Sequence, residues 1–186
     1  MITEEQKQAW LDKGYDPITF LHRQLLIEKI NKYAPFQTLL DVGCGHGPDL
    51  ALLEVLYPHA VMLGVDLIAQ DVTYATQKLR RAKIVEGDIR DVLPSLLDKS
   101  FDIVFSNGVI MYNDAHLIKH MLRVAKKAVI LSERSPLNQY AHYLRQEMDI
   151  EPIVTKIEEP IRHSWRDDGF IYEIPLEDTV ESKQSN

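Results

Sequence analysis

The sequence predicts an α/β fold with a doubly wound, mostly parallel β-sheet that ends in a C-terminal antiparallel hairpin. From residue 38 onward, short apolar runs alternate with segments of helical spacing, which is typical of repeated strand-helix units. Three glycines follow the first apolar run, where a strand of an open sheet passes into a helix. Near the C-terminus, Asp167-Asp168-Gly169 separates two further apolar runs, as in a β-hairpin.

The chain has the size of a single domain. It holds 186 residues, of which 45% are hydrophobic, enough for one continuous core but not for a second full domain. We expect N-terminal helices over residues 1–35 that pack on or over the binding cleft. The core is expected over residues 36–176, followed by a flexible tail over residues 177–186, which lack an apolar period.

The N-terminal part predicts two helices. Thr3 and Gln6 form a capping-box pattern that starts a polar helix over residues 3–13. Asp16-Pro17 starts the second helix, in which apolar residues recur at helical spacing as far as Tyr33.

The core predicts five strands that are buried on both faces, because their runs are short and sufficiently apolar. These strands are Thr38–Val42, Val61–Val65, Ala82–Val85, Phe101–Phe105 and Ala128–Leu131. Helices are expected near 48–56, 68–80, 114–126 and 136–148. Two antiparallel strands close the sheet, Ile161–Arg166 and Phe170–Pro175.

Composition argues against several kinds of partner and site. The net charge of -7 disfavours nucleic acid, whose affinity depends on Lys and Arg. Cys44 is the only cysteine, so no disulfide or cysteine-rich zinc site can form, and we expect no metal. No apolar run approaches the ~20 residues that cross a bilayer, and the N-terminus is polar. We therefore expect a soluble cytoplasmic protein without a membrane partner, and the sequence indicates no oligomeric state.

The most informative segment is Leu39–Gly47, Leu-Leu-Asp-Val-Gly-Cys-Gly-His-Gly. Its alternate glycines permit positive φ angles and let a ligand approach the main chain. The following helix N-terminus favours a carboxylate or a phosphate. A nicotinamide-binding loop has Gly-x-Gly-x-x-Gly, whereas here the third glycine comes one residue earlier and is followed by Pro48. The spacing therefore disfavours a dinucleotide ligand.

With this motif the chain resembles the class I S-adenosylmethionine-dependent methyltransferases, whose first motif is an acidic residue followed by Gly-x-Gly-x-Gly. Asp41, Gly43, Gly45 and Gly47 match that motif position by position. The resemblance extends from about residue 36 to about residue 175. It implies the seven-stranded, Rossmann-like fold of small members of this family.

Three further segments resemble family motifs at the ends of successive strands. Gly64-Val65-Asp66 resembles the second motif, whose acid accepts both ribose hydroxyls. Glu86-Gly87-Asp88-Ile89 resembles the third, which contacts adenine, and the segment ending in Ser106-Asn107-Gly108 resembles the fourth, beside the sulfonium. The resemblance therefore implies that S-adenosyl-L-methionine is bound by Asp41, Gly43, Cys44, Gly45, Gly47, Asp66, Leu67, Gly87, Asp88, Ile89, Ser106, Asn107 and Gly108.

The reaction implied is an in-line transfer of the methyl group to an acceptor, which leaves S-adenosyl-L-homocysteine as product. Where the acceptor must lose a proton, the candidate bases are Tyr112, His116 and His142, each of which has a structural role as its alternative. Met111-Tyr112 stands where the family often has histidines. The compact chain favours a small-molecule acceptor, and a protein acceptor stays open.

Two other functions remain as alternatives. A nicotinamide-dependent oxidoreductase would use the same crevice for a different cofactor. A non-catalytic S-adenosylmethionine-binding protein would keep the crevice and lack the chemistry, as the altered Met111-Tyr112 pair permits.

Overall fold

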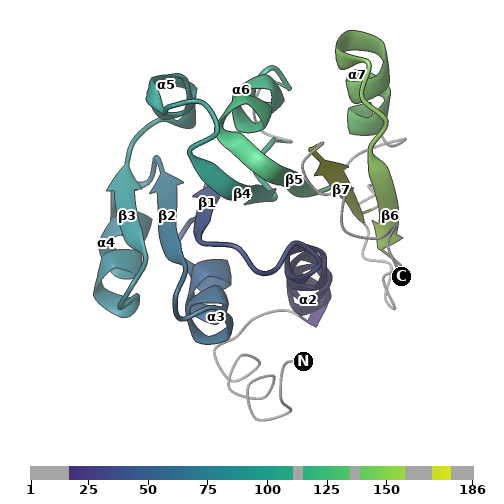
Figure 1. Ribbon diagram of the computed structural model, residues 1–186. Helices are drawn as coiled ribbons and strands as arrows, with labels where there is room; N and C mark the ends of the chain where they lie inside the picture. Colours follow the sequence, from purple (N-terminus) through teal and green to yellow (C-terminus); the bar gives the residue numbers. More distant parts are fainter. Residues whose placement is uncertain (1–16, 111–114, 135–138, 158–168, 177–186) are drawn as a thin grey trace.

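The residues that the structure describes form one seven-stranded sheet (Figure 1). The computed structural model describes residues 17–110, 115–134, 139–157 and 169–176. The strands are β1 (Thr38–Val42), β2 (Val61–Asp66), β3 (Lys83–Glu86), β4 (Phe101–Asn107), β5 (Ala125–Arg134), β6 (Ile153–Ile157) and β7 (Gly169–Pro175). Their order in the sheet is β3-β2-β1-β4-β5-β7-β6. The first five strands pair in parallel and β7 runs antiparallel to both its neighbours, which confirms the predicted fold class.

Helices cover both faces of the sheet (Figure 1). In the described residues they are α2 (Pro17–Asn31), α3 (Pro48–Leu56), α4 (Ala69–Lys78), α5 (Ile89–Ser95), α6 (Leu117–Val124) and α7 (Gln139–Met148). The first three pack into one core cluster and the last three into another. Strand side chains alternate between the two clusters, so that Leu39 of β1 joins one and Leu40 the other. Burial on both faces explains the predominantly apolar sequences of the central strands.

The boundary between α6 and β5 differs clearly from the sequence prediction, and one helix was missed. The helix expected over 114–126 ends at Val124, and β5 already begins at Ala125. This strand is long because it pairs with β4 on one side and with β7 on the other, and local sequence does not reveal such pairing. Helix α5 was not predicted, since its seven residues include Pro94 and are too short to show a helical period.

The C-terminal edge of the sheet confirms one predicted strand and supplies an unexpected partner for it. β7 covers the strand expected over Phe170–Pro175. Its edge neighbour in the described residues is β6, with Thr155 opposite Ile171, and β6 was not predicted because its five residues follow Pro152 without clear alternation. The predicted strand over 161–166, the helix over 3–13 and the tail over 177–186 lie outside the described residues.

The end of α2 and the two residues that follow it bind β7 through the buried carboxylate of Glu173. The Glu173 carboxylate accepts hydrogen bonds from Lys32 Nζ at 2.9 Å and from Tyr33 Oη at 2.8 Å, and Lys29 Nζ lies 3.4 Å away. Burial by itself would raise the pKa of Glu173. The hydrogen bonds from Lys32 and Tyr33 and the charges of both lysines outweigh that effect, and they hold the pKa below its usual value.

We expect Glu173→Gln to lower the free energy of unfolding by roughly 1–3 kcal/mol at pH 7, because it removes hydrogen bonds to a charged group. The pKa of Glu173 is lower in the folded chain than in the unfolded one. Its contribution is therefore complete above the unfolded value and is lost as the pH falls through the folded value. Urea unfolding of both proteins between pH 7 and pH 3 measures the difference, which should shrink toward the acid end. A difference that stays constant over this range would contradict the prediction.

Candidate functional site

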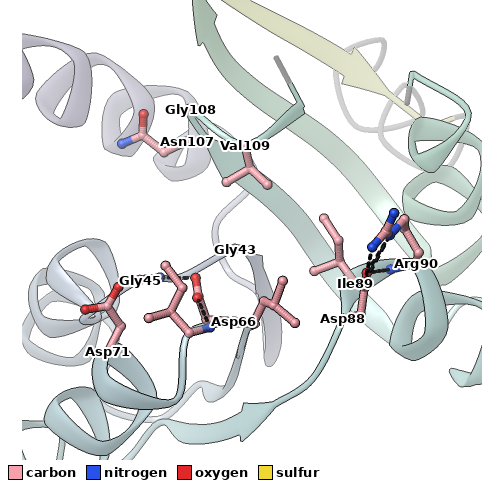
Figure 2. Close-up of a pocket in the computed structure, with 12 residues that line it drawn as sticks. Gly43, Gly45, Asp66, Asp71, Asp88, Ile89, Arg90, Asn107, Gly108 and Val109 are labelled. Carbon is pink, nitrogen blue, oxygen red and sulfur yellow. Dashed lines mark hydrogen bonds and ion pairs between the residues drawn. The ribbon is translucent and has the colours of Figure 1, made fainter. Parts of the chain in front are cut away.

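An open pocket of about 500 Å³ lies at the carboxyl ends of β1, β2, β3 and β4 (Figure 2). It is lined by Gly43, Gly45, Asp66, Leu67, Ile68, Asp71, Asp88, Ile89, Arg90, Asn107, Gly108 and Val109. The sheet order reverses between β1 and β4, and open α/β sheets bind their ligands at such a switch point. The volume falls in the range of small-molecule sites, roughly 300–1,000 Å³.

The turn after β1 forms a wall of bare main chain. Gly43, Gly45 and Gly47 have φ angles of 77°, 53° and 77°, in the left-handed region that favours glycine. The N–H groups of Gly43 and Cys44 donate to the Val65 carbonyl at 2.8 and 3.0 Å, which fixes the turn against β2. A Cβ placed on Gly43 would lie 2.4 Å from Cγ2 of Val109. Glycine is therefore required there both for the backbone angle and for the close approach of the loop after β4.

Asp66 at the end of β2 faces this wall. Its Oδ2 accepts from the Gly45 N–H at 2.7 Å, and its Oδ1 accepts from the Ile68 N–H at 2.9 Å (Figure 2). A carboxylate has about four acceptor positions, so each oxygen keeps capacity for one more donor. Two acceptors on one rigidly held carboxylate suit a pair of neighbouring hydroxyl groups.

The start of α5 carries an ion pair that sequence analysis did not anticipate. Asp88 caps the helix by accepting from the Arg90 N–H at 2.8 Å, and the Arg90 guanidinium donates to both carboxylate oxygens (Figure 2). These hydrogen bonds lower the pKa of Asp88 to about 2. The carboxylate is thus charged, and Arg90 already occupies part of its hydrogen-bonding capacity.

A buried polar chain connects α2 to the pocket. Arg23 of α2 forms an ion pair with Asp49 in the first turn of α3, and both side chains are more than nine-tenths buried. The other oxygen of Asp49 accepts from Asn107 Nδ2 at 3.1 Å. The N-terminus of α3, expected to favour a ligand anion, therefore already has a carboxylate of the protein in its first turn. In the sequence, the only indication of a carboxylate in this first turn is the position of Asp49 directly after Pro48.

Most residues predicted to bind the cofactor line the pocket. They are Gly43, Gly45, Asp66, Leu67, Asp88, Ile89, Asn107 and Gly108. Sequence analysis missed four others that line it, Ile68, Asp71, Arg90 and Val109. Each of these lies within a few residues of a recognised motif, which was the signal available for finding them.

The remaining predicted residues are not among those that line the pocket, namely Asp41, Cys44, Gly47, Gly87 and Ser106. A Cβ on Gly47 would meet Leu79 at 2.7 Å and one on Gly87 would meet Val92 at 2.8 Å, so both glycines allow close packing. The Ser106 hydroxyl donates to Glu133 at 2.9 Å. A part for these residues in cofactor binding stays a prediction.

Two titratable groups under the glycine turn favour their neutral forms. Burial, followed by the charge of Asp49, raises the pKa of Asp41, and Asp41 Oδ2 has no hydrogen-bond partner among the described residues. Burial likewise raises the pKa of Cys44, which stays a thiol and is unsuited to act as a nucleophile.

Neither of the two candidate bases that the structure describes, His116 and His142, lines the described pocket. Tyr112 falls outside the described residues. His142 is exposed on α7, and His116 is exposed at the start of α6, where its Nδ1 lies 3.0 Å from Tyr143 Oη. In the described part of the chain, no group of three or more His, Cys, Asp or Glu side chains is arranged to hold a metal. Nor is any helix of that part long and apolar enough to cross a membrane.

The sheet order, the glycine turn and the acid-lined pocket at the switch point define the class I S-adenosylmethionine-dependent methyltransferase fold. The model of a methyltransferase domain family matches residues 36–170, and the chain belongs to this family. S-adenosylmethionine is therefore the cofactor, as the sequence motifs indicated.

Trans-aconitate 2-methyltransferases are among the curated relatives that match. That of Azoarcus sp. (strain BH72) is 31% identical over 114 residues, which cover 59% of this chain and 44% of the relative. That of Rhodopseudomonas palustris (strain BisB5) is 28% identical over 143 residues, which cover 74% of this chain and 51% of the relative. The chain thus spans about half the length of the curated relatives it matches.

Solved structures show the same fold. The plantazolicin methyltransferase BpumL in complex with a triazolic desmethylPZN analog and SAH superposes with a TM-score of 0.65 at 12% identity, covering 92% of this chain and 91% of that one. Magnesium protoporphyrin IX methyltransferase (ChlM) from Synechocystis PCC 6803 with bound SAM gives 0.65 at 16% identity, covering 94% and 85%. These relatives and structures offer no support for the oxidoreductase or the non-catalytic alternative.

Proposed function

We propose that this chain transfers a methyl group from S-adenosylmethionine to a small-molecule acceptor. The observation that carries the proposal is that a glycine turn with positive φ angles and the carboxylate of Asp66, which is hydrogen-bonded to that turn, line one pocket together. Such a pocket accepts an adenosylated amino acid, with its ribose hydroxyls on Asp66 and its amino-acid portion against the main chain of Gly43 and Gly45. Membership of the methyltransferase family supports this assignment.

In this proposal the chain contributes alignment and desolvation. Bound S-adenosylmethionine supplies an electrophilic methyl group on its sulfonium. Asp88 and Ile89 lie at the β3 end of the pocket and would orient the adenine. Asn107 and Gly108 at the β4 end would flank the sulfonium, next to the side from which an acceptor approaches.

We propose His116 as the base for an acceptor that must lose a proton, and because His116 does not line the described pocket, such an acceptor would extend beyond the pocket to reach it. When its Nδ1–H donates to Tyr143 Oη, the basic lone pair lies on Nε2, and the ring is held in one orientation. Tyr112 and His142 remain candidates of the same kind, one outside the described residues and the other exposed on α7. Trans-aconitate is the first acceptor to test, because the curated relatives are named for it.

We expect S-adenosylmethionine to raise the unfolding temperature by roughly 5–10 °C at a hundred times its Kd, since binding then adds about 2.7 kcal/mol of stability. Differential scanning fluorimetry measures the shift, with NADH as a matched control that should leave the temperature unchanged. Saturating S-adenosylmethionine without a shift would remove the cofactor assignment.

Methyl-labelled S-adenosylmethionine, incubated with trans-aconitate and then with fractionated cell extract, identifies the acceptor. In this assay His116→Gln should lower transfer and leave cofactor affinity unchanged.

A further inference from the structure

We propose that Glu133 is a positioning residue of the cofactor pocket, which holds the loop after β4 in the shape that lines the pocket. Glu133 belongs to no motif of the sequence and does not itself line the pocket. The inference rests on the proposed function, because it concerns the affinity of the same pocket for S-adenosylmethionine.

One oxygen of Glu133 accepts hydrogen bonds from three donors, which lie at the end of β4 and in the loop that follows it. Its Oε1 accepts from Ser106 Oγ at 2.9 Å, from the Val109 N–H at 3.2 Å and from the Ile110 N–H at 3.0 Å. The preceding residue of β5 adds a fourth bond, since the Ser132 carbonyl accepts from the Gly108 N–H at 2.8 Å. The end of β5 therefore binds the loop at three consecutive backbone N–H groups.

Glu133 and two of its three partners are buried, so solvent offers no substitute for the bonds that they form. Glu133 is 1% exposed, and Ser106 and Ile110 are 0% exposed. A buried carboxylate is tolerated only when donors surround it, and a buried backbone N–H without an acceptor is costly. Removing the carboxylate therefore forces the loop to move until its N–H groups find other acceptors.

Movement of this loop reaches the pocket directly. Asn107, Gly108 and Val109 all line it, and the Val109 side chain packs against the backbone of Gly43 in the glycine wall. Figure 2 shows Val109 and Gly108 above the turn that holds Gly43 and Gly45. Glu133 thus determines the spacing between the loop after β4 and the glycine turn, because it binds the main-chain N–H groups of Val109 and Ile110.

Asp102 provides a matched control at the opposite end of β4. It is also a buried carboxylate that accepts two successive backbone N–H groups, from Gln37 at 2.6 Å and Thr38 at 3.2 Å. These bonds join the amino end of β4 to the start of β1, whereas the pocket lies at the carboxyl ends of both strands. Asp102→Asn therefore removes a comparable structural carboxylate without contact with the pocket.

The test compares Glu133→Ala, Glu133→Gln and Asp102→Asn by calorimetric titration with S-adenosylmethionine, well below their unfolding temperatures. We expect Glu133→Ala to weaken binding by roughly 30-fold or more, the loss of one or two hydrogen bonds to a charged group. Glu133→Gln keeps an acceptor oxygen and should recover part of the loss, to within roughly tenfold of wild type. Asp102→Asn should lose stability and keep wild-type affinity.

Hydrogen exchange at the amides of Val109 and Ile110 provides a readout that needs no cofactor. Exchange at both should accelerate in the Glu133 variants and stay unchanged in Asp102→Asn. If the wild type binds no S-adenosylmethionine, the proposed function fails while the exchange measurement still tests the positioning role. If the Glu133 variants lose stability but keep wild-type affinity or wild-type exchange, Glu133 is only structural and the inference is overturned. Should Glu133→Ala not fold, Glu133→Gln decides by the same criteria.

Discussion

Gly43→Ala is expected to abolish detectable cofactor binding and to lower the free energy of unfolding by roughly 2–5 kcal/mol. The left-handed backbone angle of 77° at this position costs a side-chain-bearing residue about 1–2 kcal/mol. The new methyl would also lie 2.4 Å from the Val109 side chain, and overpacking of this kind costs typically 1–3 kcal/mol. Val109 has a stiff β-branched side chain and sits on a loop held by Glu133, so it cannot move aside cheaply. The turn that holds Gly43 and the loop that holds Val109 must therefore move apart.

Gly45→Ala separates these two costs. Gly45 has a φ of 53°, but a Cβ there meets nothing within 4 Å. Its stability should therefore fall only by the backbone cost, about 1–2 kcal/mol. Urea unfolding measures both variants, and titration with S-adenosylmethionine measures their affinities. Equal destabilisation of the two variants would show that the contact with Val109 does not constrain the glycine wall.

The parts of the fold that follow from short-range pattern were predicted well. The central strands are predominantly apolar because helices cover both of their faces, and this pattern indicates a parallel sheet. Motifs at the ends of parallel strands must meet at one edge, so the sequence could place Gly43, Asp66 and Asn107 around a common pocket before any coordinates.

The parts that were missed depend on contacts between distant segments. Glu133 is one acid among 28 in the sequence, and only the arrival of the β4 loop beside β5 gives it three donors. Arg23 and Asp49 are separated by 26 positions and meet because α2 packs beside α3. Strand β6 is defined by its pairing with β7 rather than by its own five residues. Pairings of this kind leave no local period to detect.

Asp66→Asn is expected to weaken S-adenosylmethionine binding by at least roughly 100-fold, which corresponds to about 3 kcal/mol. The carboxylate serves two groups at once. It holds the N–H groups of Gly45 and Ile68, and its remaining acceptor positions face the pocket. An amide has one oxygen in place of two, so one of the backbone N–H groups would face an N–H₂ donor. The ribose hydroxyls would at the same time lose a charged acceptor.

Asp71→Asn is the matched control, because Asp71 lines the same pocket and the substitution removes the same charge. If Asp66 acts through its hydrogen bonds, Asp71→Asn should change the affinity by less than roughly fivefold, the effect of a partly screened charge in an open site. If it acts only through the negative potential of the pocket, both variants should weaken binding equally. Titrating both proteins at low and high salt separates these cases, since screening reduces a long-range charge effect and leaves directional hydrogen bonds to the ribose largely intact.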